Sequence, residues 1–339
     1  MDVREVIVHA CDDRWAPFDS RRSEPVERSK YAETRDRVMS VRPAWLTFRR
    51  YAAATTGMTL TLFAIGVYTA ATGSGLACEA QWPLCSDQLI PALTINPDFI
   101  EWFHRVWAMV TGFLIIGVAA WTWMGSFDRR TRLAATLAVV VLPVQITVGA
   151  ITVTIGGLVP DGYTVSTHAA HLIVALIIFT LLGLTTLWGR DPGSRGGSPG
   201  LLRVALGIAL AGLVGSAVLS RAVPFLTYSP GAQAWFYVVG LTAHLGLLAA
   251  IVYATEAMGG GYAGIDAATA RTTRTLAGGA MALLVVTLLL GRDLVLYTSF
   301  WQRVNLVALG GAVALAAGAV WLARRESGTQ TVSVPTGGD

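Results

Sequence analysis

Apolar residues in this chain fall into long blocks, without the periodicity that an amphipathic helix or a half-buried strand would show. Each block approaches the roughly 20 residues that an α-helix needs to cross the hydrocarbon core of a bilayer. The pattern therefore predicts an all-α integral membrane protein with eight transmembrane helices. The blocks cover residues 51–73, 102–123, 133–156, 165–188, 201–221, 235–256, 273–291 and 300–322.

Composition agrees with this prediction and excludes other classes of protein. Hydrophobic residues make up 54% of the chain and charged residues 14%, which is typical of a polytopic membrane protein rather than a soluble domain. A nucleic-acid-binding protein would cluster basic residues with aromatic ones, whereas the arginines here lie in short loops between apolar blocks. We therefore expect membrane lipid, and no nucleic acid, around the chain.

Arginine is concentrated in alternate loops, and this asymmetry predicts the orientation in the cell membrane. Segments 73–100 and 157–164 contain no Lys or Arg, and the other two loops on that side contain only Arg221 and Arg292. Because cytoplasmic loops carry the excess of basic residues, both termini are predicted to be cytoplasmic and the Cys78–Glu101 loop to face outward. The supporting arginines are Arg49, Arg50, Arg129, Arg130, Arg132, Arg190, Arg195, Arg271, Arg274, Arg324 and Arg325.

Polar segments divide the chain into two halves with a tail at each end. The first tail is polar and charge-rich, so we expect it to be cytoplasmic with little fixed structure. Met39 is an alternative start codon, in which case the first 38 residues are not translated. The predicted parts are an N-terminal tail (1–50), an N-terminal four-helix half (51–188), a Gly/Ser/Pro linker (189–200), a C-terminal four-helix half (201–323) and a C-terminal tail (324–339).

The division into four and four spans indicates an internal duplication. A local match supports it, because Trp102-Phe103-His104 at the start of the second span corresponds to Trp235-Phe236-Tyr237 at the start of the sixth. The sequence therefore predicts two related four-helix repeats that have diverged.

Four histidines lie in predicted spans: His104, His168, His171 and His244. His104 and either His168 or His171 lie within about two turns of the outward end of their spans, so two imidazoles are expected to converge at one depth. Such a pair suits axial ligation of a haem, whereas zinc would require three or four converging ligands that these apolar spans do not supply. Depth alone favours His168 over His171.

Two charged residues flank His104. Glu101 is three residues before it and shares its helix face, which makes Glu101 either a general base or electrostatic stabiliser beside a ligand, or a water-exposed acid at a helix start. Arg105 is placed either to pair with Glu101 at i, i+4 or to reach a haem propionate. Ionisable groups at the mouth of a membrane span are costly to bury, so this cluster is a functional candidate.

Cys78 and Cys85 lie in the loop predicted to face the oxidising side of the membrane, where a disulfide persists. Such a pair serves as a structural staple of the loop or as a redox-active pair beside the site.

Several stretches in the first half, in the same order, resemble the haem A synthases, a family of eight-helix membrane enzymes. The resemblance implies that His104 and His171 flank the substrate haem O, that Glu101 serves the oxidation of a porphyrin methyl group to formyl, and that Cys78 and Cys85 form a disulfide. The matching stretches are Thr72-Gly73-Ser74-Gly75-Leu76-Ala77-Cys78, Trp82-Pro83-Leu84-Cys85, Glu101-Trp102-Phe103-His104-Arg105, Gln145-Ile146-Thr147-Val148-Gly149-Ala150-Ile151-Thr152-Val153 and His171-Leu172-Ile173-Val174-Ala175.

The second half departs from that family. A typical member has two further histidines, in the sixth and eighth spans, that ligate a second haem, haem b. Here Gln302 stands where the eighth-span histidine is expected, Tyr237 corresponds to His104, and His244 lies roughly two turns deeper. The resemblance therefore leaves, at most, a haem b site built from His244, alone or with an unusual partner such as Gln302.

The resemblance also implies partners: an enzyme that supplies haem O, and a terminal oxidase that receives haem A. Whether the chain forms a homo-oligomer is left open. Two rival hypotheses remain. The first is a haem-binding carrier, assembly factor or electron-transfer cytochrome on the same scaffold. The second is a small-molecule transporter. The four-plus-four arrangement favours it, whereas the polar groups lie away from the membrane midplane, which argues against it.

Overall fold

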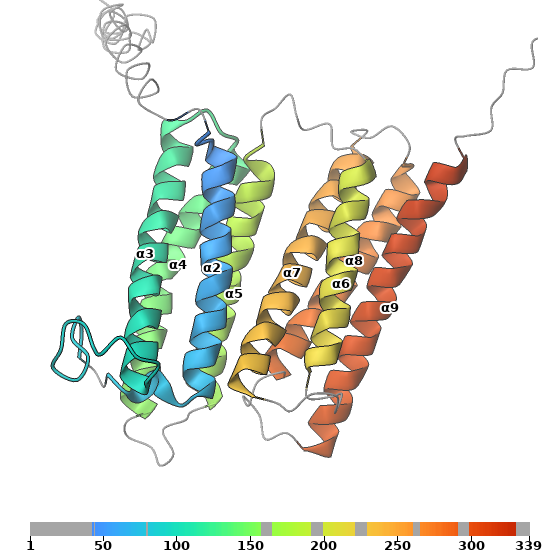
Figure 1. Ribbon diagram of the computed structural model, residues 1–339. Coiled ribbons are helices and arrows are strands. Elements are labelled where there is room, and N and C mark those ends of the chain that lie inside the picture. The colour runs from blue at the N-terminus through green and yellow to red at the C-terminus, as the bar shows by residue number, and fades with distance from the viewer. Residues whose placement is uncertain are drawn as a thin grey trace, which may run out of the picture. The chain divides into compact units, whose positions relative to one another are not determined.

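A computed structural model describes residues 43, 45–78, 81–156, 165–190, 199–220, 229–259, 265–290 and 298–329. Residues 48–339 form one unit and the first 47 residues another. The elements of the larger unit are α2 (Phe48–Ala71), the short helix η1 (Ser74–Leu76), α3 (Pro97–Met124), α4 (Arg129–Gly156), α5 (Val165–Trp188), α6 (Pro199–Leu219), α7 (Pro230–Met258), α8 (Ala267–Leu290) and α9 (Ser299–Thr329) (Figure 1).

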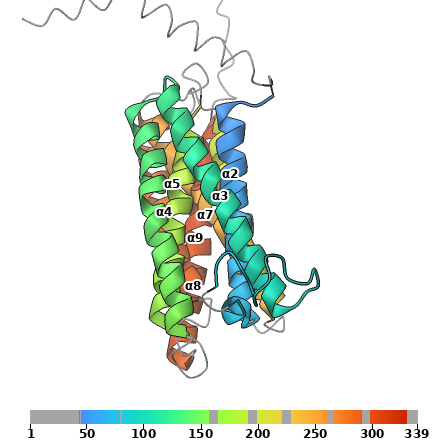
Figure 2. The ribbon, with the colours of Figure 1, turned by 90° about the vertical axis from the view of Figure 1, so that its left-hand side faces the viewer.

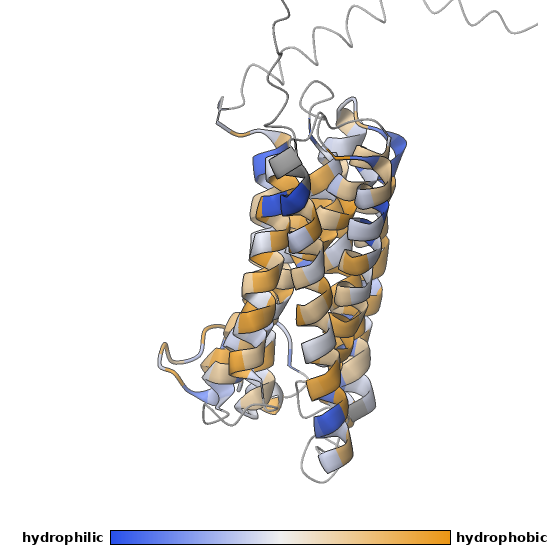
Figure 3. Cartoon of the chain, turned by 90° about the vertical axis from the view of Figure 1, so that its right-hand side faces the viewer, coloured by the Kyte–Doolittle hydropathy of each residue, from blue (hydrophilic) through white to orange (hydrophobic). Residues whose placement is uncertain are grey.

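Eight helices in the described part of the chain are long and apolar enough to cross a membrane, which confirms the all-helical prediction. Their surface agrees, since hydrophilic segments gather near the helix ends and the middle is mostly apolar (Figure 3). The predicted tails and linker lie largely outside the described residues, although α6 begins at Pro199, inside the predicted linker.

Capping residues, rather than hydropathy, set where several helices begin. Helix α3 starts five residues before its apolar block, because the Asn96 side chain accepts a hydrogen bond from the Phe99 N–H at 2.8 Å and Pro97 opens the first turn. Helix α7 starts in the same way, with Ser229 accepting from the Ala232 N–H at 3.2 Å and Pro230 following it. The two helices that carry the matched Trp-Phe motif therefore also share a cap.

Each half of the chain folds as a ring of four helices (Figures 1 and 2). In the first, α2 packs against α3 and α5, and α4 packs against the same two helices. In the second, α7 and α9 both pack against α6 and α8. The rings meet where α7 lies against α2 and α5. Helices α3 and α5 are therefore diagonal partners, which face each other across the first ring.

The two rings differ in how they are filled. The second has a continuous core in which Leu206, Tyr237, Leu247 and Leu284 are completely buried, together with alanines on all four helices. The first ring is closed at the end away from η1 by a cluster of Ile115, Ala138, Ile178 and Leu182. Small residues such as the alanines of the second ring let helix backbones approach closely in a membrane, where no hydrophobic effect drives helices together.

Candidate functional site

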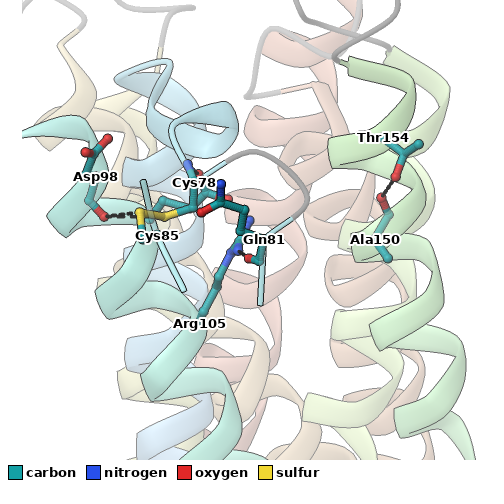
Figure 4. Close-up of polar contacts among 8 residues, drawn as sticks. Cys78, Gln81, Cys85, Asp98, Arg105, Ala150 and Thr154 are labelled. Carbon is teal, nitrogen blue, oxygen red and sulfur yellow. Dashed lines mark hydrogen bonds and ion pairs between the residues drawn. A yellow bond between two sulfur atoms is a disulfide. The ribbon is translucent and has the colours of Figure 1, made fainter. Parts of the chain in front are cut away.

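The loop end of the first ring, where the helices meet the segment 72–96, carries the predicted site residues. We call this segment the disulfide loop, because Cys78 and Cys85 are joined in it as expected. It runs from η1 to the start of α3 and lies against that helix, with the Cys85 sulfur 3.5 Å from the carbonyl oxygen of Asp98 (Figure 4). The loop therefore covers the end of α3 from which Glu101 and His104 arise.

Glu101 is not a water-exposed acid, since it is only 2% exposed. One carboxylate oxygen accepts a hydrogen bond from the Cys78 N–H at 2.6 Å, and the other pairs with the Arg105 guanidinium. Arg105 also donates to the Gln81 carbonyl (Figure 4). Glu101 and Arg105 thus fasten the disulfide loop to α3 at Cys78 and at Gln81. Both oxygens of the buried Glu101 carboxylate therefore have a hydrogen-bond donor.

His104 lies one turn further along α3, against α2. A Cβ atom added at Gly66 would stand 3.0 Å from the Cε1 atom of His104 and 3.6 Å from each ring nitrogen. Such a distance is too short for an unstrained contact, so the glycine provides the space in which the imidazole lies. The Nδ1 atom of His104 is buried and has no hydrogen-bond partner within the described ranges.

His171 lies against a glycine in the same way on the opposite side of the ring. We call the space that such a glycine leaves for an imidazole a glycine seat. A Cβ atom at Gly149 of α4 would stand 3.0 Å from the Cε1 atom of His171. The side-chain amide of Gln145, one turn earlier on α4, lies 3.2 Å from the Nε2 atom of the same imidazole. The four helices thus supply two imidazoles on diagonal helices and a glycine beside each.

Three of the four helices around these histidines have no buried residue at this level, whereas α2 has Phe63 and Val67 buried there. No residue in 102–110 of α3, 139–155 of α4 or 166–175 of α5 is buried, although all of these residues belong to membrane-length helices. The cluster around Ile115 closes only the far end. A flat apolar ligand held between two imidazoles fits this arrangement, because the ligand itself would supply the missing core.

His168, the alternative ligand, lies one turn closer to the loop end than His171 and is half-buried. The geometry distinguishes the two, because the glycine seat and the amide contact are both made with His171. Sequence reasoning missed Gln145 and the two glycines as site residues. Gln145 and Gly149 stood in a matching stretch, but their relation to His171 depends on the packing of α4 against α5.

The residues named for a second haem are not brought together. His244 is 2% exposed, and its Nε2 atom lies 2.9 Å from the Thr180 hydroxyl of α5, in the other ring. Gln302 is exposed on α9, which packs against α6 and α8. Tyr237, the counterpart of His104, is fully buried and donates a hydrogen bond to the Leu288 carbonyl at 2.7 Å. These residues and the filled core around them do not fit a second haem.

Fold and site together define an integral membrane protein whose first four-helix bundle carries a facing histidine pair beneath a disulfide loop. Residues 49–223, more than half of the chain, match the family model of the cytochrome oxidase assembly proteins (COX15-CtaA). The protein belongs to this family.

Relatives with established names match over part of the chain. It is 36% identical over 131 residues to the haem A synthase of Bacillus licheniformis, covering 38% of this chain and 41% of that protein. It is 33% identical over 175 residues to the haem A synthase of Exiguobacterium sibiricum, covering 50% of this chain and 54% of that protein. A protohaem IX farnesyltransferase of Halobacterium salinarum is 35% identical over 140 residues, 41% of this chain and 28% of its own length.

The chain therefore spans less than half the length of the first of these relatives in the matched region. No solved structure matches it.

Proposed function

We propose that this protein is a haem A synthase, a membrane oxidoreductase that converts haem O to haem A by oxidising a porphyrin methyl group to formyl. The observation that carries the proposal is the pair of imidazoles, His104 and His171, each beside a glycine and on diagonal helices whose stretches 102–110 and 166–175 contain no buried residue. Membership of the cytochrome oxidase assembly family and the likeness to haem A synthases support it.

In this proposal the two imidazoles hold the substrate through its iron, and the protein fixes the macrocycle edge relative to Glu101. Conversion of a methyl to a formyl group is a four-electron oxidation in which water supplies the oxygen atom, four protons leave, and an external electron acceptor takes the electrons. Glu101 supplies a negative charge one turn from His104, held in place by Arg105 and the Cys78 N–H, where it stabilises positive charge or accepts a proton. Arg105 acts by positioning Glu101 and the loop.

We further propose that both termini are cytoplasmic, that the disulfide loop lies on the outer side, and that the rings are diverged repeats. The arginine distribution supports the first two statements, and the shared cap-Pro start of α3 and α7 supports the third. An enzyme that makes haem O would supply the substrate, and a terminal oxidase would receive the product.

One observation favours a second candidate, a non-catalytic haem carrier. Both oxygens of Glu101 are occupied by protein donors, so its role is fully accounted for by fastening the disulfide loop. On this reading the ring would hold haem without changing it.

Co-expression with a haem O source, followed by extraction and mass analysis of the haems, separates the two functions. We expect hydroxymethyl or formyl haem from the wild type and unmodified haem from Glu101→Gln, which keeps the side-chain size but loses the charge. Unmodified haem from both proteins, with an electron acceptor present, would support the carrier. If the membranes contain no bound haem, both candidates fail.

A further inference from the structure

The side-chain amide of Gln145 contacts the Nε2 atom of His171, which faces α4. The amide nitrogen of Gln145 lies 3.2 Å from Nε2 of the imidazole. An amide nitrogen only donates hydrogen bonds, so with the Gln145 amide in this orientation Nε2 is the acceptor and the ring proton sits on Nδ1. The contact therefore fixes the tautomer of His171 and holds a lone pair on the nitrogen next to α4.

The same helix face fixes the ring in position. Gly149 is four residues after Gln145, so the two lie on one face of α4. A Cβ atom at Gly149 would stand 3.0 Å from Cε1 and 3.5 Å from Nδ1 of His171, while Gln145 contacts Nε2. Helix α4 thus holds one edge of the imidazole: Gly149 leaves space for the ring, and Gln145 bonds to it.

The opposite side of the ring differs. His104 has a glycine seat of the same kind, and its Nδ1 atom, like that of His171, is buried without a hydrogen-bond partner among the residues described. What His104 lacks among those residues is a side-chain amide beside its ring like that of Gln145 beside His171. The Oε1 atom of Gln145 is likewise buried and has no partner there. The two imidazoles are therefore unequal. His171 has the Gln145 amide nitrogen beside its Nε2 lone pair, where it competes with any other partner of that atom. The Oε1 atom of the same amide is a hydrogen-bond acceptor that no described residue uses.

We infer that Gln145 is a positioning residue that makes His171 the displaceable ligand of the pair. It presents Nε2 of His171 as an unprotonated donor atom, and it offers that atom an alternative partner when the atom is not bound to iron. His104 has no such alternative and is the firmer ligand. The assignment of an iron to these histidines rests on the proposed function, but the tautomer does not.

The first part of the test uses the haem-free protein and does not depend on the proposed function. The chain has 5 histidines, so ¹⁵N-histidine labelling gives few signals, and a His171→Gln variant identifies the signal of His171. We expect His171 to carry its proton on Nδ1 in the wild type and to be a mixture of tautomers in Gln145→Leu. A proton on Nε2 in the wild type would overturn the inference, whether or not Gln145→Leu folds.

The second part uses the protein loaded with iron protoporphyrin IX, with carbon monoxide as the competing ligand of the reduced iron. Gln145→Leu removes the group that stabilises dissociated His171, so carbon monoxide is expected to bind about fivefold more weakly than to the wild type. That factor corresponds to one hydrogen bond of about 1 kcal/mol. An unchanged or stronger carbon monoxide affinity would contradict the inference.

The matched control is Gln233→Leu, the same substitution on α7 in the other ring, which should change neither measurement. A wild type that binds no iron protoporphyrin, yet shows His171 with its proton on Nδ1, would remove the proposed function and leave the tautomer assignment standing.

Discussion

Gly66 and Gly149 show how single residues create room for the site. Neither glycine has a backbone conformation that demands it, since both lie within helices, yet each adjoins an imidazole that a Cβ atom would press upon. The sequence allowed the histidines to be predicted, because ionisable groups in apolar spans stand out. It did not reveal the glycines, because a glycine in a membrane helix has many ordinary explanations and only packing identifies its neighbour.

Substituting Gly66 should therefore displace His104 and lower haem content. In Gly66→Val the new side chain overpacks the ring, at a cost of about 1–3 kcal/mol, so we expect the amount of bound haem to fall about tenfold or more. Gly57→Val on the same helix is the control, because a Cβ atom there meets nothing within 4 Å. Haem content per chain, measured after purification, checks this. Equal content in the two variants would show that His104 does not hold haem.

The hydrogen-bond partners of Glu101 could not all be predicted from the sequence either. Spacing placed Glu101 and His104 on one helix face and left Arg105 with two alternatives, of which the structure shows the pairing with Glu101. The bond to the Cys78 N–H joins residues 23 positions apart and depends on how the disulfide loop folds back over α3. Local periodicity carries no information on such a contact.

At the scale of elements, hydropathy located all eight long helices of the described chain and both ends of α5, but it missed where several other helices begin. Helix α8 begins at Ala267, six residues before its predicted block, because the Asp266 carboxylate accepts hydrogen bonds from the N–H groups of Ala268 and Thr269. Polar capping residues extend a helix beyond its apolar stretch, so a hydropathy pattern underestimates its length.

Close packing of α6 on α7 depends on small residues, which gives a stability prediction. A Cβ atom at Gly246 would stand 2.8 Å from the Ala205 carbonyl oxygen and 2.8 Å from the Ala209 nitrogen, both in the backbone of α6. Gly246→Leu should therefore separate the helices and lower the unfolding free energy by about 1–3 kcal/mol. Thermal unfolding in detergent measures this. Gly207→Leu, at a position with nothing within 4 Å, is expected to unfold like the wild type.

Helix α7 places His244 at the contact between the two rings, where its Nε2 atom lies 2.9 Å from the Thr180 hydroxyl of α5. We predict that His244→Leu keeps the wild-type haem content of about one per chain. Its stability should fall by roughly 0.6 kcal/mol, the average for a hydrogen bond between membrane helices, because Thr180 retains its own bond to the Leu176 carbonyl. Iron and haem analysis of both proteins provides the measurement. Two haems in the wild type and one in the variant would contradict this prediction and show that His244 binds a second haem.

At the scale of the whole molecule, the number of spans was predictable and the difference between the rings was not. Both halves have similar apolar composition, and only the structure shows that alanine and leucine fill the second ring while α3, α4 and α5 have no buried residue in the stretches around the histidines. The contact of the rings through α7 likewise reflects tertiary packing. Arg190, after α5, bonds to Glu256 of α7 at 2.9 Å and contributes to that contact.

Orientation in the membrane is the remaining prediction at this scale. In intact cells, a membrane-impermeant maleimide should label Leu93→Cys, a 72% exposed position of the disulfide loop, and should label Gly200→Cys only after permeabilisation. Both variants carry Cys11→Ser, and the bridged cysteines do not react. The opposite labelling pattern would reverse the assignment of the termini.

The position of the haem between α3 and α5 is the central claim, and exchange of single axial ligands tests it most directly. Methionine in place of a ligating histidine changes the absorption spectrum of a haem and raises its reduction potential. We predict these changes for His104→Met and for His171→Met, and none for His168→Met or His244→Met. A wild-type spectrum in both His104→Met and His171→Met, or the change in His244→Met instead, would contradict the account.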